Sequence, residues 1–275
     1  MMPVPADIDP LPGSVVACGG IDVWLTRYDQ IDDPRLLDRM RAVLDDEERA
    51  HEHVFHFADD RKRYLVTRAM VRSVLSRYVA LPPEAWDFTK NEYGRPAIAT
   101  TLLDLVPEAR GLVFNLSHTR GLIALAIARN RALGVDVEHL SLREVSLGIA
   151  HRFFSPIEVS DLAREPDHAQ QARFFEYWTF KESYIKARGM GLSLPLDGFS
   201  FEFPHPDAVR IRIEPQLRDH DERWSFWQYR PSAEYLMALC AERGDTPPAI
   251  AMRRCVPLGV ESPVTMPALR RSHRG

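Results

Sequence analysis

The chain has 275 residues, of which 45% are hydrophobic and 27% are charged, a composition typical of folded soluble proteins. This length is sufficient for one large domain or for two lobes of roughly 100–150 residues, each with its own core. The formal net charge of −4, from 35 basic and 39 acidic side chains, argues against a globally basic nucleic-acid-binding protein.

The residue pattern gives no signal for export or membrane insertion. In the middle of the chain the longest apolar run, Leu122 to Ala128, is far shorter than the roughly 20 residues that span a bilayer. Residues 1–20 contain four prolines and no basic region, unlike a signal peptide. The three isolated cysteines indicate neither a disulfide framework nor a zinc site. We therefore expect a protein of the reducing cytoplasm that does not bind membranes.

The first half of the chain is predicted to contain a strand, two helices and a pair of strands. It follows a proline-rich lead at residues 1–12. β-Branched and aromatic residues predict strands, apolar residues three and four apart predict helices, and Gly with Pro predicts a turn. In chain order, we expect a strand at 15–28, helices at 45–52 and 65–78, a turn at 91–96, and strands at 112–116 and 122–128 joined by a polar loop at 117–121.

The second half repeats this plan. A strand is expected at 134–140, a helix at 155–165, a helix with a wide aromatic stripe at 170–188, and strands at 199–203, 209–213, 225–230 and 235–240. This repetition predicts an α+β fold of two pseudo-symmetric lobes. We assign residues 13–120 to the N-terminal lobe and 121–243 to the C-terminal lobe. Residues 244–275, rich in proline and arginine, are expected to form a mobile tail.

The sequence GVDVE at residues 134–138 suggests a site for a cation. On a strand, Asp136 and Glu138 share one face about 7 Å apart, while the two valines point into the core. Carboxylates this close repel each other, and Mg²⁺ is a cation that binds through one or two carboxylates together with substrate phosphates. The alternative is a solvated strand edge with two ordinary surface acids.

The helix at 170–188 carries a second polar pair. Glu182 and Lys186 are four residues apart, so they lie on one helix face. Only four of the 35 basic residues are lysines, and two of them, Lys181 and Lys186, fall in this helix. Because the rest of the helix is heavily aromatic, we expect the polar stripe to face the other lobe or a cleft. If Glu182 faces Asp136 and Glu138 there, a third carboxylate would complete a metal site. The alternative is an ordinary surface ion pair.

Two further motifs carry groups that bind anions. In FNLSH at 114–118, Ser117 and His118 can donate to an anion, but neighbouring residues of an extended chain point apart, which excludes a Ser–His relay. In NEYGRP at 91–96, Arg95 lies between Gly94 and Pro96 and is a candidate for binding phosphate. Taken alone, each motif is more typical of a capped loop than of an anion site.

Together, these motifs resemble the Sfp-type 4′-phosphopantetheinyl transferase family. The matching segments cover about residues 44 to 203 and run in the family's order: an arginine-rich helix over 60–75, NEYGRP, FNLSH, GVDVE, RFFSPIE at 152–158 and WTFKESYIKARGMGLSLPL at 178–196. The resemblance implies two pseudo-symmetric lobes with the active site between them. It also implies transfer of the 4′-phosphopantetheine arm of coenzyme A to a serine of an acyl or peptidyl carrier protein, with release of adenosine 3′,5′-bisphosphate.

The resemblance also implies roles for individual residues. Mg²⁺ would be held by Asp136, Glu138 and Glu182, with Glu182 taking the serine proton directly or through a water. Lys186 would contact the phosphates. The coenzyme A site would be lined by Arg63, Gly94, Arg95, Ser117 and His118, the last two near the 3′-phosphate. We expect a monomer that acts on coenzyme A and a carrier protein and does not bind nucleic acid.

The chain departs from the family at two places. Relatives often have lysines that grip the nucleotide upstream of the arginine-rich helix, where this chain has Glu47 to His51, so Arg49 or protonated His51 would have to substitute. Arg95 stands where lysine is common.

Two other functions remain open from the residues. One is a non-catalytic module that binds coenzyme A or a carrier protein, although such a module does not need three carboxylates beside a pyrophosphate. The other is a Mg²⁺-dependent phosphodiesterase, which would need a basic groove with interleaved aromatic residues.

Overall fold

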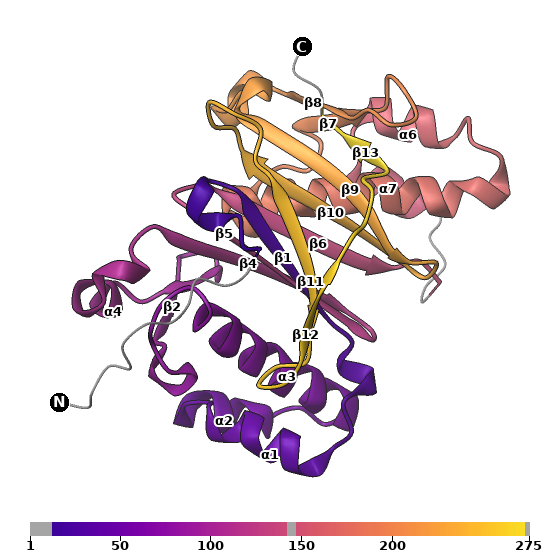
Figure 1. Ribbon diagram of the computed structural model, residues 1–275. Coiled ribbons are helices and arrows are strands. Elements are labelled where there is room, and N and C mark those ends of the chain that lie inside the picture. Colours follow the sequence, from indigo (N-terminus) through magenta and orange to yellow (C-terminus); the bar gives the residue numbers. More distant parts are fainter. Residues whose placement is uncertain (1–12, 142–146, 273–275) are drawn as a thin grey trace.

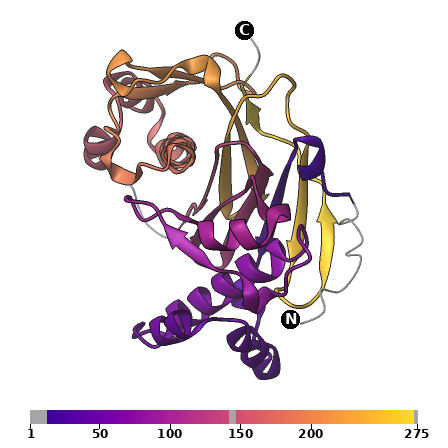
Figure 2. The same ribbon diagram turned by 90° about the vertical axis from the view of Figure 1, so that its left-hand side faces the viewer.

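The computed structural model describes residues 13–141 and 147–272. The proposed lead at residues 1–12 lies outside these residues. In the described part, two antiparallel-rich sheets pack face to face, and helices cover the outer face of each (Figures 1 and 2). No helix of this part is both long and apolar enough to cross a lipid bilayer.

The first half of the chain forms the first sheet and its helices. Its elements are β1 (Ile21–Thr26), α1 (Pro34–Ala42), α2 (Asp46–Glu52), α3 (Ala58–Leu75), β2 (Phe88–Lys90), β3 (Pro96–Ile98), α4 (Thr100–Leu105), β4 (Leu112–Thr119) and β5 (Leu122–Arg129). The second half forms the second sheet and its helices. Its elements are β6 (Leu133–His139), α5 (Leu147–Phe153), α6 (Pro156–Leu162), α7 (Asp167–Arg188), β7 (Phe199–Glu202), β8 (Arg210–Ile213), β9 (Trp224–Ser232) and β10 (Tyr235–Glu242).

The predicted duplication is confirmed by the strand pairing. In each half the first strand pairs antiparallel with the last strand, which pairs in turn with the one before it. This gives β1-β5-β4 in the first sheet and β6-β10-β9 in the second. A long helix and a small hairpin follow the first strand in both halves, α3 with β2–β3 and α7 with β7–β8. The fold is therefore α+β with two pseudo-symmetric lobes.

The protein has three hydrophobic cores, because the central strands of both sheets are buried on both faces. Trp24 of β1 packs with α3 residues such as Met70 under the first sheet, whereas its neighbours Val23 and Leu25 face the second sheet. Phe226 of β9 packs against α7 in the third core. Alternation along each strand thus builds a helix layer, two sheet layers and a second helix layer.

The predicted lobe boundary at residues 120 and 121 is wrong. β5 pairs with β1 and β4, so it belongs to the first sheet, and the change of lobe falls in the turn between Arg129 and Leu133. The predicted loop at 117–121 is also too long, because β4 continues to Thr119 and the turn is Arg120 with Gly121. Polar residues at the end of β4 resembled a loop because they face a polar site.

The prediction of a mobile C-terminal tail is also wrong. Residues beyond 243 form β11 (Ile250–Cys255), β12 (Glu261–Val264) and β13 (Arg270–Arg271). β11 lies parallel to β1 in the first sheet, and β13 pairs with β9 in the second (Figure 1). These strands were not predicted because proline is rare inside sheets. Pro263, however, lies in edge strand β12, where a missing N–H is tolerated.

Candidate active site

Gly134 allows the strand and the helix of the predicted site to approach closely. A Cβ atom at this position would lie 2.0 Å from the carbonyl oxygen of Ser183 and 2.5 Å from the amide nitrogen of Ala187. Only a residue without a side chain fits between β6 and α7 at this point. This contact brings Lys186 of α7 next to β6.

Asp136 is the centre of a contact between the two lobes. Its side chain is almost fully buried, and Oδ1 accepts hydrogen bonds from Ser117 Oγ at 2.9 Å and from Lys186 Nζ at 2.7 Å. Lys186 Nζ also donates to Ser117 Oγ at 2.8 Å. Because Ser117 lies on β4 and the other two lie on β6 and α7, both halves of the chain contribute to this cluster.

The ion pair of Lys186 rules out the surface-pair alternative. Its ammonium lies 2.7 Å from Asp136 Oδ1 of the same lobe and donates to Ser117 Oγ of the first lobe at 2.8 Å, so the polar stripe of α7 faces the other lobe, as predicted. The spacing paired Lys186 with Glu182 on one helix face, whereas the ion-pair partner of Lys186 is Asp136 on β6.

Asn115 joins β4 to β6 and was not identified from the sequence. Its Oδ1 accepts from the backbone N–H of Val135 at 2.8 Å, and Ser117 Oγ accepts from that of Val137 at 3.3 Å. The two side chains replace the ladder of main-chain bonds that adjacent strands of one sheet would share. The signal was the two-residue spacing, which puts Asn115 and Ser117 on one side of the strand.

Glu138 lies further along β6 and has a partner on α7. Trp178 Nε1 donates to Glu138 Oε1 at 2.9 Å, while the indole stacks on Phe174. Trp178 lies in the helix for which the sequence predicts a wide aromatic stripe, but its side chain is only half-buried and orients a carboxylate. Val135 and Val137 are buried between the sheets, as expected.

The Glu182 carboxyl group is strongly affected by its surroundings. Burial raises its pKa to about 7, the nearby charge of Asp136 acts in the same direction, and Lys186 opposes both. Repulsion between Glu182 and Asp136 indicates that a further positive charge would be favourable here.

The residues fit a hard divalent cation. Asp136 Oδ2 is buried and has no hydrogen-bond partner, which is rare for a charged oxygen in a folded protein. Carboxylate oxygens of Asp136, Glu138 and Glu182 are the ligand type that Mg²⁺ prefers. Among the described residues, however, no group of three or more acidic, histidine or cysteine side chains is already gathered as a metal site.

A cleft of about 540 Å³ opens beside this cluster, between α2, α3, β2 and β4. Arg63 and His118 both line it. Arg63 forms an ion pair with Asp60 at 2.7 Å. Burial lowers the pKa of His118, and the positive charges of Arg63 and Lys186 lower it further. His118 thus faces the cleft while its neighbour Ser117 faces Asp136.

Two residues of the segment from Glu47 to His51 have different roles. Glu48 is buried and accepts hydrogen bonds from Arg68 and from Arg72, the latter at 2.8 Å, so it holds α2 against α3. His51 lines the cleft, with its ring centroid 5.0 Å from that of Tyr64.

Gly94 and Arg95 lie in the turn between β2 and β3, as predicted. Gly94 has a φ of +83°, and the Arg95 guanidinium donates to the carbonyl oxygens of Ala187 and Leu133, each at 3.0 Å. Arg95 lines a different cleft from that of Arg63 and His118. Its role in phosphate binding stays a prediction.

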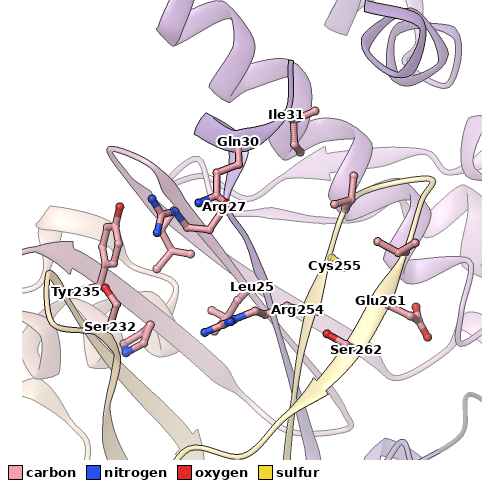
Figure 3. A pocket seen from close by; sticks show the side chains of 14 residues that line it. Leu25, Arg27, Gln30, Ile31, Ser232, Tyr235, Arg254, Cys255, Glu261 and Ser262 are labelled. Atoms are coloured by element: carbon pink, nitrogen blue, oxygen red, sulfur yellow. The ribbon is translucent and has the colours of Figure 1, made fainter. Parts of the chain in front are cut away.

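Another cavity, of about 420 Å³, lies where β1, β11 and β12 meet the turn between β9 and β10 (Figure 3). Figure 3 shows Arg27, Arg254 and Tyr235 around it. None of the predicted site residues lines this cavity, and Glu261 is its only acidic lining residue. It therefore lacks the paired carboxylates of the predicted chemistry.

Comparison with known proteins covers both halves of the chain. Residues 33–130 match the family model of the 4′-phosphopantetheinyl transferase N-terminal region, and residues 132–240 match that of the 4′-phosphopantetheinyl transferase superfamily. The two models meet in the turn between β5 and β6, where the sheets place the lobe boundary.

Individual relatives agree with these models. The 4′-phosphopantetheinyl transferase ffp of Bacillus subtilis is 36% identical over 215 residues, which is 78% of this chain and 89% of the relative. The transferase Sfp of Bacillus subtilis is 34% identical over the same shares. The transferase HetI of a Nostoc species is 32% identical over 80% of this chain and 86% of the relative.

These matches extend over most of the chain and include every motif that the two lobes bring together. The resemblance found in the sequence is confirmed, and the chain belongs to the 4′-phosphopantetheinyl transferase superfamily as an enzyme of that class.

Proposed function

We propose that this enzyme transfers the 4′-phosphopantetheine arm of coenzyme A to a serine of an acyl or peptidyl carrier protein, with Mg²⁺ bound between the lobes. The observation that carries the proposal is the cluster of Asp136, Ser117 and Lys186 beside the cleft. In this cluster the ammonium of Lys186 lies beside a buried carboxylate, Asp136, of which one oxygen has no hydrogen-bond partner. A pyrophosphate with its cation would be stabilised here.

Asp136, Glu138 and Glu182 would hold Mg²⁺, which when bound would neutralise the charge that develops on the pyrophosphate. Lys186 adds a second positive charge at the same place. Arg63 and His118 would bind the nucleotide phosphates from the cleft that they line.

In the reaction, the serine oxygen of the carrier attacks the β-phosphorus of coenzyme A. The bond to the bridging oxygen breaks, and adenosine 3′,5′-bisphosphate leaves. Glu182 takes the serine proton, directly or through a water.

The two other functions are less well supported. A binding module gains nothing from a buried carboxylate with an unpartnered oxygen, and the family matches are to transferases. A nucleic-acid phosphodiesterase would need a basic groove, whereas Asp45, Glu47 and Glu48 line the cleft beside its cations.

The test is a mass measurement on the carrier. The protein is incubated with coenzyme A, Mg²⁺ and a panel of apo-carriers from fatty acid, polyketide and non-ribosomal peptide synthesis. We expect one or more carriers to gain the mass of phosphopantetheine in amounts equal to the adenosine 3′,5′-bisphosphate released. Saturable coenzyme A binding with no mass gain on any carrier would favour the binding module.

A further inference from the structure

The hairpin formed by β2 and β3 in the first lobe holds the end of α7 in the second. Its turn is organised by Asn91, whose Oδ1 accepts from the backbone N–H of Tyr93 at 3.0 Å and of Arg95 at 2.9 Å. The Nδ2 of the same side chain donates to the carbonyl oxygen of Gly189 at 2.7 Å. Asn91 therefore shapes the turn and binds the cap of the helix at once.

Arg95 connects the two elements that carry the active site. One guanidinium nitrogen donates to Ala187 at the end of α7, and the other donates to Leu133 at the start of β6. Lys186 directly precedes the first of these contacts, and Asp136 is three residues after the second. The guanidinium thus links the strand of Asp136 to the helix of Lys186, close to the tight approach at Gly134.

Glycine at position 189 makes room for this link. Its φ is +68°, as the left-handed end of a helix requires, and a Cβ atom there would lie 3.2 Å from Arg95 Nη1. Arginine is suited to the link because its planar fork has two donors in fixed directions, whereas lysine has a single nitrogen.

We propose that Arg95, aimed by Asn91, is a positioning residue that sets the distance between Lys186 and Asp136, and that it does not act chiefly as a phosphate ligand. This inference rests on the proposed transfer reaction. Its half-buried guanidinium is already engaged by two carbonyl groups, and the cleft that it lines is not the one lined by Arg63 and His118.

The substitution Arg95→Lys separates the two roles. Lysine keeps the charge that a phosphate needs and loses the double link. If Arg95 positions Lys186, kcat should fall roughly tenfold, since small displacements in a site have large effects on rate, and the KM for coenzyme A should change less than about twofold. Amide hydrogen exchange of a peptide covering residues 185–190 should become faster, a readout that does not depend on activity.

Arg129→Lys is the matched control, because Arg129 also donates to two carbonyl oxygens, but these belong to Glu108 and Arg110 and not to α7 or β6. It should leave both kinetic constants and the exchange of residues 185–190 unchanged. Asn91→Ala should behave like Arg95→Lys. Thermal denaturation of each variant checks that it is folded.

Two results would overturn the proposal. One is a raised KM for coenzyme A at unchanged kcat in Arg95→Lys, with reduced preference over dephospho-coenzyme A, which would make Arg95 a phosphate ligand. The other is unchanged exchange at residues 185–190. If wild-type protein modifies no carrier, the transfer function fails, whereas the exchange measurement still decides whether Arg95 holds α7.

Discussion

The two carboxylate oxygens of Asp136 have different surroundings. Oδ1 is shared by Ser117 and Lys186, while Oδ2 is buried without a partner. Lys186 therefore supplies part of the positive charge that this carboxylate needs, and Oδ2 stays available to a cation. A compact ammonium can do this without covering both oxygens.

Lys186→Arg tests whether Oδ1 of Asp136 serves the lysine while Oδ2 serves the cation. A guanidinium can pair with both oxygens of Asp136 and would compete with the cation for Oδ2. We expect kcat to fall roughly tenfold, equivalent to about 1.4 kcal/mol of transition-state stabilisation, and the half-saturating Mg²⁺ concentration to rise. Initial rates of carrier modification across a Mg²⁺ titration measure both quantities. Unaltered values would remove Lys186 from the site.

His118 should couple coenzyme A binding to pH. Its pKa is lowered in the free protein, first by burial and then by Arg63 and Lys186, which favours the neutral imidazole. A bound phosphate favours the imidazolium and would raise this pKa, so binding should take up a proton. The Kd of coenzyme A should therefore increase as pH rises through the pKa of the bound state.

Calorimetry in buffers of different ionisation enthalpy measures this proton uptake. His118→Asn should abolish it, and dephospho-coenzyme A, which lacks the 3′-phosphate, should show little of it with wild type. Equal uptake with both ligands would place the 3′-phosphate away from His118.

Among the elements, β6 and α7 determine the geometry of the site, because they carry Asp136 and Lys186 and pack directly against each other. The contact at Gly134 sets their spacing, and the fully buried ion pair of Lys181 and Glu158, with a nitrogen–oxygen distance of 2.8 Å, fixes α7 from its other side. Errors in this packing would move Lys186 relative to Asp136.

Gly134→Ala should therefore damage both stability and activity. The added methyl group would meet backbone atoms of α7, which cannot move aside as a flexible side chain can. We expect a loss of about 1–3 kcal/mol in the free energy of unfolding, measured by urea denaturation, together with a large loss of kcat. Gly198→Ala is the control, since its Cβ would meet only the side chain of Leu217 at 3.3 Å. Equal effects of the two substitutions would contradict the proposed spacing.

The elements were predicted best where periodicity is local and strong. The helix at 170–188 and the strand at 134–140 correspond to α7 and β6, because apolar residues at fixed spacing determine the buried face of each. The partners of polar groups could not be predicted in this way. Arg95 looked like a phosphate ligand because a sequence does not show that the carbonyl of Ala187, 92 residues away, lies within reach. The role of Asn115 was missed for the same reason.

At the scale of the whole molecule, the C-terminal strands complete both sheets. β11 pairs with β1 over Ile21–Leu25, and β13 pairs with β9, so one segment crosses both lobes. Parallel pairing between residues more than 220 positions apart leaves no local signal, and the prolines between these strands suggested disorder. This explains why the tail prediction failed although the two-lobe fold was predicted correctly.

Truncation after Arg243 should therefore prevent stable folding. It would expose the edge of β1 and would remove Met252 and Cys255, two buried residues of β11 that pack in different cores. We expect aggregated protein, or protein without a cooperative thermal transition. Truncation after Val264, which removes only β13 among the C-terminal strands, is the control and should stay folded. A cooperative transition in the shorter protein would show that β11 is dispensable.

The central claim is that Asp136, held between the lobes by Ser117 and Lys186, binds the cation on which transfer depends. The most direct test is the rate of carrier modification by Asp136→Ala, followed by mass across a Mg²⁺ titration. Removing this carboxylate relieves its repulsion with Glu182, so the variant should remain folded. We expect its rate to be lower by at least about 100-fold at every Mg²⁺ concentration. Near wild-type transfer with an unchanged Mg²⁺ midpoint would contradict the assignment of Asp136 and of the site built around it.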